Sequence, residues 1–225
     1  MIFISGMTVM LRLLQAAVFT AEQMIPVSMM EFTAFFIGKN SKVKYVEKHY
    51  GSGDGKGQRI MNPETIVEVG ENSYMEMDTA QIKGVDSTIR KTTVKLDKNA
   101  SIKVMERLMT HGEQRAESRF VVDLNGENSG ANIISRSVAK DNSYQLFQSV
   151  LNGNEMCSGH TECDAIIVGN AKISSIPEIT ANNSDAALIH EAAIGKIAGE
   201  QIIKLMTLGL TEEEAEEQII SGFLK

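Results

Sequence analysis

Both cysteines of the chain lie in one short segment, with a histidine midway between them. The segment reads CSGHTEC and spaces Cys157, His160 and Cys163 as Cys-x2-His-x2-Cys. Thiolate and imidazole groups suit zinc or iron, and a short loop can present such ligands to one ion. A structural zinc site needs a fourth ligand, usually from a second paired motif, and we find no such motif in the sequence. The alternative is two small buried cysteines and a histidine at a turn facing water.

The adjacent pair His190 and Glu191 is a second candidate. We expect both residues near the start of a helix, where neighbours point about 100° apart, so at most one is buried while the other reaches solvent or a ligand. A simpler interpretation is that the helix dipole favours Glu191 in the first turns and that His190 covers the end of the body. The residue types alone do not decide between these alternatives.

Common catalytic signatures are absent from the sequence. Walker A, GxGxxG, GxSxG and HExxH motifs are all missing, and the glycine-rich stretch at 51–57 lacks the Walker spacing. Nothing therefore indicates that this chain hydrolyses a nucleotide by itself. We predict that it is not an enzyme.

The middle of the chain repeats one unit, which consists of an alternating apolar stretch, a polar turn and a second alternating stretch. The turns centre on Asn40, Asn72, Asn99, Asn128 and Asn142. Asn, Asp and Gly accept the positive φ of tight turns, and alternation with period two indicates strands. Units that recur about every 25 to 30 residues favour a β-helix, in which each rung covers the edge of its neighbour. A sandwich of two facing sheets is the alternative.

The apolar period changes near the C-terminus. After Ala181 the apolar residues recur at three and four, which predicts a helix over 185–208 that stops at Gly209. Thr211 then opens a second helix as a capping box with Glu214.

Three regions follow from these patterns. Residues 1–30 form an N-terminal segment, with a short helix over 8–23 packed on the body, residues 31–181 form the β core, and residues 182–225 form a helical region.

Composition excludes several function classes. The formal net charge is −7 and no Lys/Arg run exceeds two residues, which argues against nucleic acid or anionic lipid as a partner. Two cysteines fit a reduced, cytoplasmic compartment, and the apolar stretch at 7–19 is too short to span a bilayer. A β-helix enzyme acting on carbohydrate would want aromatic platforms, yet tryptophan is absent and tyrosine occurs only four times.

From Glu162 to Lys225 the sequence closely resembles the end of the SufB/SufD family, the scaffold subunits of the Suf iron-sulfur cluster assembly machinery. The likeness is carried by Cys163-Asp164, Pro177, His190-Glu191-Ala192, Gly195-Lys196-Ile197, Glu200-Gln201, Leu205-Met206, Gly209-Leu210, Ala215 and Gly222-Phe223. Upstream, SRFVVDLNGENSGANIISRSVA and KVKYVEKHYG look like looser family rungs.

This resemblance implies a right-handed parallel β-helix with a C-terminal α-helical hairpin, which agrees with the repeat pattern. It also implies that the hairpin docks a SufC-type ABC ATPase, which hydrolyses the ATP, and that the chain pairs with itself or with a SufB/SufD paralogue. Nascent clusters would be built where the two β-helices meet. The partner-binding residues that it implies are Ile194, Lys196, Ile197, Gln201, Leu205, Gly209, Leu210 and Phe223.

The ligand residues carry over only in part. His190 and Glu191 fall on the His-Glu pair of the family motif, and Cys163 falls on the cysteine before Asp in SufB-like chains. SufB-like members carry another cysteine before the proline, whereas this chain reads GNAKISSIP and has Ile189 where SufB has an acid. The implied cofactor is a transient iron-sulfur cluster, which need not remain in the purified protein. Its expected ligands are Cys163, His190 and Glu191, with Cys157 and His160 as weaker candidates.

The alternative role is that of a SufD-like partner. Such a subunit shapes the complex and binds the ATPase but holds no cluster itself. The shortage of cysteine favours this interpretation.

Overall fold

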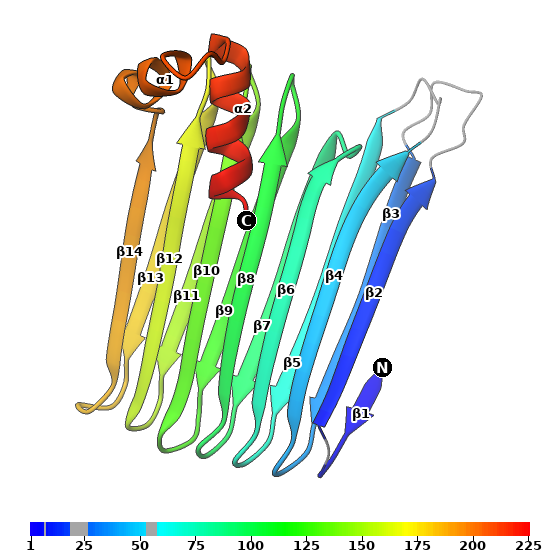
Figure 1. Cartoon of the computed structure of the whole chain (residues 1–225). Helices are drawn as coiled ribbons and strands as arrows, with labels where there is room; N and C mark the ends of the chain where they lie inside the picture. Colours follow the sequence, from blue (N-terminus) through cyan, green and yellow to red (C-terminus); the bar gives the residue numbers. More distant parts are fainter. Residues whose placement is uncertain (7, 19–26, 53–57) are drawn as a thin grey trace.

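The computed structural model describes residues 1–6, 8–18, 27–52 and 58–225. In this part of the chain, parallel strands form two seven-stranded sheets that face each other (Figure 1). The odd-numbered sheet contains β1 (Ile2–Ile4), β3 (Val27–Ile37), β5 (Arg59–Val69), β7 (Ser87–Leu96), β9 (Arg115–Leu124), β11 (Tyr144–Gly153) and β13 (Lys172–Ala181). The even-numbered sheet contains β2 (Thr8–Val18), β4 (Lys42–Ser52), β6 (Tyr74–Lys83), β8 (Ser101–Thr110), β10 (Ser129–Ala139), β12 (Cys157–Ile167) and β14 (Ala187–Gly195).

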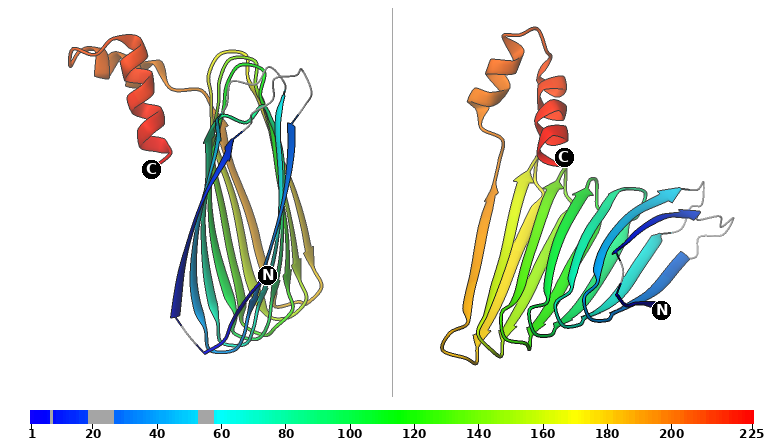
Figure 2. Two further views of the ribbon diagram at one scale, coloured as in Figure 1. Left: turned by 90° about the vertical axis from the view of Figure 1, so that its right-hand side faces the viewer. Right: turned by 60° about the horizontal axis from the view of Figure 1, so that its bottom comes forward.

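The chain passes from one sheet to the other at every turn, so two consecutive strands make one rung of a parallel β-helix. Figure 2 shows the two sheets edge-on, with the interior between them. The β-helix that the sequence repeat predicts is therefore confirmed, and the sandwich alternative is wrong because every strand pair is parallel.

Equivalent residues of successive rungs stack in columns along the interior. One column joins Val67, Val94, Val122 and Leu151 through the strand register, and all four side chains are buried. β-Branched side chains suit such a pleated, half-buried surface. The period-two pattern of the sequence thus becomes an inner face that forms the core and an outer face that meets solvent.

The tight turns at one end of the rungs use the backbone that the asparagines allow. Positive φ angles occur at Asn40, Asn72, Asn99 and Asn128, as the turn pattern predicts. In the fifth predicted turn the positive φ belongs to Asp141 and not to Asn142. Side-chain amides also link successive turns, because Asn99 donates to Asn72 at 2.9 Å and Asn128 donates to Asn99 at 3.3 Å.

Two predicted helices are corrected by the structure. Residues 187–195 form strand β14, so the helix predicted over 185–208 shrinks to α1 (Gly199–Met206). β14 pairs with β12 over its whole length, and this tertiary pairing outweighs the helical spacing of the apolar residues. At the other end of the chain, Thr8–Val18 forms strand β2 and not a helix, while 19–26 lie outside the described residues.

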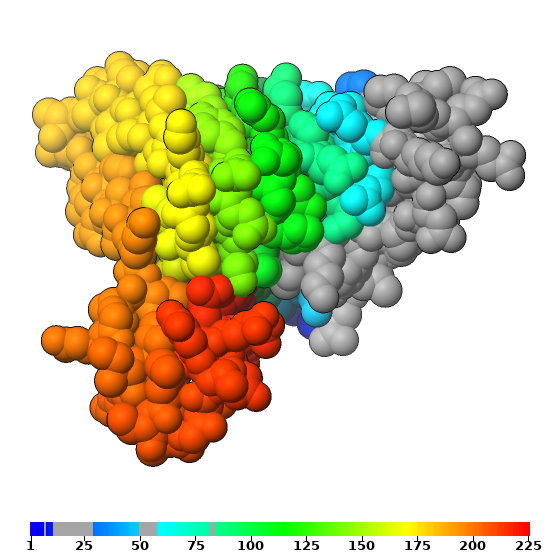
Figure 3. All heavy atoms as spheres, turned by 90° about the horizontal axis from the view of Figure 1, so that it is seen from above, coloured from blue at the N-terminus to red at the C-terminus, as the bar shows by residue number. Residues whose placement is uncertain are grey.

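The second C-terminal helix agrees with its prediction. α2 (Glu212–Phe223) begins with a capping box, in which the Thr211 side chain accepts from the backbone N–H of Glu214 and the Glu214 side chain accepts from that of Thr211. Its Ala215 and Ile220 are buried, and the Lys140 ammonium on the β-helix lies 2.8 Å from Glu216. None of the α1 residues is buried, and the two helices project from the last rungs of the body (Figure 3).

Among the described residues, neither helix has the length and apolar character that crossing a bilayer requires.

Candidate functional site

Strand β12 divides the cysteine segment between its two faces. Cys157, Thr161 and Cys163 are buried and point into the interior, whereas His160 is on the outer face. The two cysteines lie six positions apart on an extended strand, so their separation along it is about 20 Å. The structure therefore does not bring Cys157, His160 and Cys163 together around one ion, because the segment is a strand and not a short loop.

Strand β14 divides the second candidate pair in the same way. His190 is half-buried on the interior side, and Glu191 is exposed on the opposite face. On the helix that the sequence pattern predicts, these neighbours would lie about 100° apart, whereas adjacent residues of a strand point to opposite faces. The five candidate ligands thus form an interior set and an outer set, separated by the sheet.

Two members of the interior set, Cys163 and His190, lie beside one serine of the facing sheet. The Ser175 hydroxyl of β13 lies 3.4 Å from Nε2 of His190. The same hydroxyl is close enough to the Cys163 thiol to lower its pKa. On the other side of the imidazole, Nδ1 of His190 lies 2.7 Å from the Thr161 hydroxyl. Cys163 and His190 are therefore neighbours in space at the last rungs, although 27 positions separate them in the sequence.

Cys163 and His190 are both held neutral. Burial raises the pKa of the Cys163 thiol to about 11, and the nearby Glu106 charge acts in the same direction, against the effect of Ser175. Burial also lowers the pKa of His190, assisted by the charge of His160. At neutral pH the site therefore contains a protonated thiol and a neutral imidazole. A metal ion that binds here must displace the thiol proton, because the thiolate is the ligand.

The outer set is a looser arrangement. Nε2 of His160 lies 3.9 Å from the Glu191 carboxylate, whose side chain is 68% exposed. Nδ1 of His160 is 3.2 Å from the Asn132 side-chain oxygen on β10. Such an exposed pair is weakly held.

Sequence reasoning missed Ser175 and Thr161. Thr161 stands two positions before Cys163 on the same strand, so the period-two rule alone could have placed both on one face. Ser175 could not be found in this way, because its proximity to Cys163 and His190 depends on how β13 of one sheet packs opposite β12 and β14 of the other.

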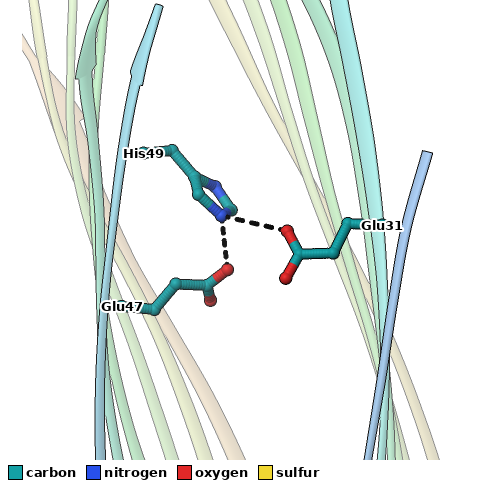
Figure 4. A group of neighbouring side chains, drawn as sticks. All are labelled: Glu31, Glu47 and His49. Carbon is teal, nitrogen blue, oxygen red and sulfur yellow. Dashed lines mark ion pairs between the residues drawn. The ribbon is translucent and has the colours of Figure 1, made fainter. Parts of the chain in front are cut away.

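A second polar cluster lies deeper in the interior, toward the N-terminal rungs. Figure 4 shows Glu47 and His49 of β4 facing Glu31 of β3. Nε2 of His49 is 2.5 Å from Glu47 and 3.4 Å from Glu31. These three side chains could supply ligand atoms for a metal ion, since the atoms lie within 4.8 Å of one another.

Arg90 already provides a cation for this cluster. Its guanidinium lies 3.1 Å from Glu47, 3.7 Å from Glu106 and 2.8 Å from Nδ1 of His49. A guanidinium can only donate, so Nδ1 of His49 must accept and Nε2 must carry the ring proton that Glu47 accepts. Nε2 therefore has no lone pair to offer a metal ion in this arrangement. Burial raises the pKa of Glu47, but Arg90 and His49 outweigh it and hold the pKa at about 2.

The predicted partner-binding residues lie on β14, on the helices and in the segments that join and follow them. Ile194, Lys196, Gln201 and Gly209 are exposed, whereas Ile197, Leu205, Leu210 and Phe223 are half-buried. A groove of about 470 Å³ separates the helices from the end of β12. Its apolar lining includes Ile167, Ile197, Ile202, Ile203 and Met206.

The fold and the site define a class of protein, a parallel β-helix that carries a buried thiol and an imidazole at its last rungs and two helices beyond them. The family described as SUF system FeS cluster assembly, SufBD core domain, matches residues 28–223. The chain belongs to this SufBD family, as the C-terminal resemblance predicts.

Curated relatives agree with the family match. An iron-sulfur cluster assembly SufBD family protein of Methanocaldococcus jannaschii is 36% identical over 190 residues, which cover 84% of this chain and 60% of that protein. Relatives of the same description from Pyrococcus horikoshii and Archaeoglobus fulgidus are each 30% identical, cover 85% of this chain and match over 58% and 51% of their own lengths. The chain thus spans 51% to 60% of the length of these three relatives.

Proposed function

We propose that this chain is a scaffold on which nascent iron-sulfur clusters are assembled, with Cys163 and His190 as its ligands. The observation that carries the proposal is the meeting of these two side chains at Ser175 on the last rungs. Thiolate is the usual protein ligand of iron-sulfur clusters, and imidazole can replace it. In this proposal iron and the cluster are substrates that the scaffold must later release. A site with few protein ligands suits both their binding and their release.

Two ligands from one chain leave a cluster incomplete, which points to a second subunit. β13 and β14 are the edges of the two sheets, and neither pairs with a further described strand. Pro177 within β13 suits an edge position, because proline cannot donate to a ladder. Both edge strands also expose apolar side chains, namely Ile176, Ile179, Ile189 and Ile194. A second copy or a paralogue that joins these edges would bring its own thiol and imidazole to the same place.

The projecting helices fit a docking site for a SufC-type ABC ATPase. Ile203 and Met206 of α1 and the following Leu208 are 62%, 44% and 75% exposed. Apolar side chains gathered in this way on a projecting element mark a protein-interaction surface. ATP hydrolysis then belongs to the partner, and this chain acts as a non-enzymatic component.

His160 and Glu191 have a lesser part in this proposal. They lie on the outer face of the sheet, so they do not reach an ion held by Cys163 and His190 inside the same chain. Cys157 is excluded from that ion by its distance along β12.

The proposal is tested by anaerobic reconstitution of the purified chain with ferrous iron and sulfide. Cluster absorption should appear in the natural chain and be lost in Cys163→Ser. Cys157→Ser is the matched control, because it changes the same residue type on the same face of the same strand, and it should keep the absorption. Equal loss in both variants, or no loss in Cys163→Ser, would argue against the proposal.

A SufD-like structural role is the second candidate, and the single cysteine at the site favours it. In that case the chain alone forms no cluster but restores assembly when it is mixed with a SufB-type partner.

A further inference from the structure

We propose that Thr161 is a positioning residue, whose hydroxyl holds Nδ1 of His190 so that Nε2 is the atom that takes iron. This inference rests on the proposed function, because it concerns the ligand role of His190.

The contact is short and lies within the core. Thr161 is 1% exposed, and its Oγ1 is 2.7 Å from Nδ1 of His190. The two residues are direct register partners on β12 and β14, so the hydroxyl stands beside the ring. The threonine is itself fixed, because the buried Ser149 hydroxyl of the facing sheet donates to Oγ1 at 3.3 Å.

The other ring nitrogen points to the candidate metal position. Nε2 lies 3.4 Å from the Ser175 hydroxyl, which is also next to the Cys163 thiol. A neutral imidazole binds a metal ion through one nitrogen while the N–H of the other nitrogen is hydrogen-bonded by a supporting group, which fixes the ring and its tautomer. A hydroxyl can accept that N–H by rotating its own proton away. In the proposed arrangement the Thr161 hydroxyl accepts the Nδ1–H, which leaves the lone pair on Nε2, the nitrogen that faces the Ser175 hydroxyl beside Cys163.

The position of His190 makes this support necessary. β14 is an edge strand, so a neighbouring strand flanks His190 on one side only. Thr161 and Ser175 are the hydrogen-bond partners of the ring among the described residues. Without the Thr161 hydroxyl, the His190 ring would keep only its 3.4 Å contact with Ser175 and could turn away from the Cys163 thiol.

The first test measures the hydrogen bond at Nδ1 of His190 in the metal-free protein. Nitrogen NMR on 15N-histidine-labelled chain should show that the Nδ1 signal of His190 moves in Thr161→Val, which removes the hydroxyl, and stays in place in Thr161→Ser, which keeps it. Thr79→Val is the matched control, since Thr79 is also buried in the interior but has no hydrogen-bond partner among the described residues. An Nδ1 signal that is unchanged in Thr161→Val would overturn the proposal.

The second test adds ferrous iron and sulfide under anaerobic conditions. Loss of such a supporting hydrogen bond lowers metal affinity by about 10- to 100-fold, so Thr161→Val should need correspondingly more iron to reach half occupancy. Its reduced cluster should also lose the histidine 14N coupling in pulsed EPR, while Thr161→Ser and Thr79→Val keep it. Natural affinity and coupling in Thr161→Val would contradict the inference. If the natural chain forms no cluster, the proposed function fails, and the NMR result alone decides whether Thr161 orients the ring.

Discussion

The Cys163 thiol combines deep burial with a neighbouring negative charge. Glu106, Ser135 and Cys163 occupy one register column of the even-numbered sheet, and the Glu106 carboxylate accepts hydrogen bonds from Ser118 at 2.7 Å and from Ser135 at 3.0 Å. Burial and this carboxylate together keep the thiol protonated at neutral pH. A buried, protonated thiol is a poor target for oxidation, and in the proposed function it would release its proton when iron binds.

Thiol alkylation tests this description of Cys163. The pKa rises from 9.0 to about 11, so at pH 8 the thiolate fraction is about a hundredfold smaller in the folded chain than in the unfolded chain. Because the folded chain holds the proton more tightly, this contribution to stability is complete below pH 9 and is lost as the pH rises toward 11. Iodoacetamide labelling at pH 8 followed by mass spectrometry should show that Cys163 reacts at least about a hundredfold more slowly in the folded chain than in a urea-unfolded control. Equal rates in the two states would contradict the assignment.

The Arg90 cluster predicts a large effect on stability. Arg90→Met leaves the buried Glu47 and Glu106 without their cation, and breaking a buried ion pair in this way costs about 3 to 5 kcal/mol. Arg119→Met is the control, because Arg119 is 42% exposed and pairs with Glu117, which predicts about 0 to 1 kcal/mol. Urea unfolding of both variants measures the difference. Similar losses would show that the interior cluster does not stabilise the fold in this way.

At the scale of elements, the strands of the central repeat were predictable, whereas β2 and β14 at the two ends of the chain were predicted as helix. In residues 187–195 the apolar Leu188 and Ala192 are four positions apart, as in a helix, while Leu188, Ala192 and Ile194 all lie at even positions, as on one face of a strand. The segment becomes a strand and not a helix because it pairs with the edge of β12. A local sequence pattern contains no information on that edge. Cys163 and His190 were candidates from their residue types, and the family resemblance implied their role as cluster ligands. The contacts of Thr161 and Ser175 with His190 required the register of β12 with β14 and the opposition of the two sheets.

Helix α1 and strand β14 should have separate roles, ATPase binding and self-association. Ile203→Lys on α1 places a charge in the proposed ATPase surface and should weaken binding of a purified SufC-type ATPase by about tenfold, a loss of about 1.4 kcal/mol. Ile189→Lys on β14 is the matched variant, with a side chain of similar exposure. It should leave ATPase binding intact and reduce self-association. Titration calorimetry and sedimentation measure the two effects, and an ATPase that is released equally by both variants would contradict this division.

At the scale of the whole molecule, the candidate site, the unpaired sheet edges at β13 and β14 and the two helices lie together at the C-terminal end of the β-helix. The turns and the stacked columns fix the spacing of the rungs, and the last rungs carry the thiol, the imidazole, the two free sheet edges and the projecting helices. The proposed sites for cluster binding, subunit pairing and ATPase docking are therefore adjacent. Movement of the helices by an ATPase would act directly on the strands that hold the site.

Native mass spectrometry of the anaerobically reconstituted chain tests the central claim most directly, because it counts chains and clusters in one species. The account predicts two chains that share one iron-sulfur cluster, and it predicts that the cluster is absent from His190→Ala and from Cys163→Ser. A cluster held by a single chain, or a cluster that persists in both variants, would contradict it.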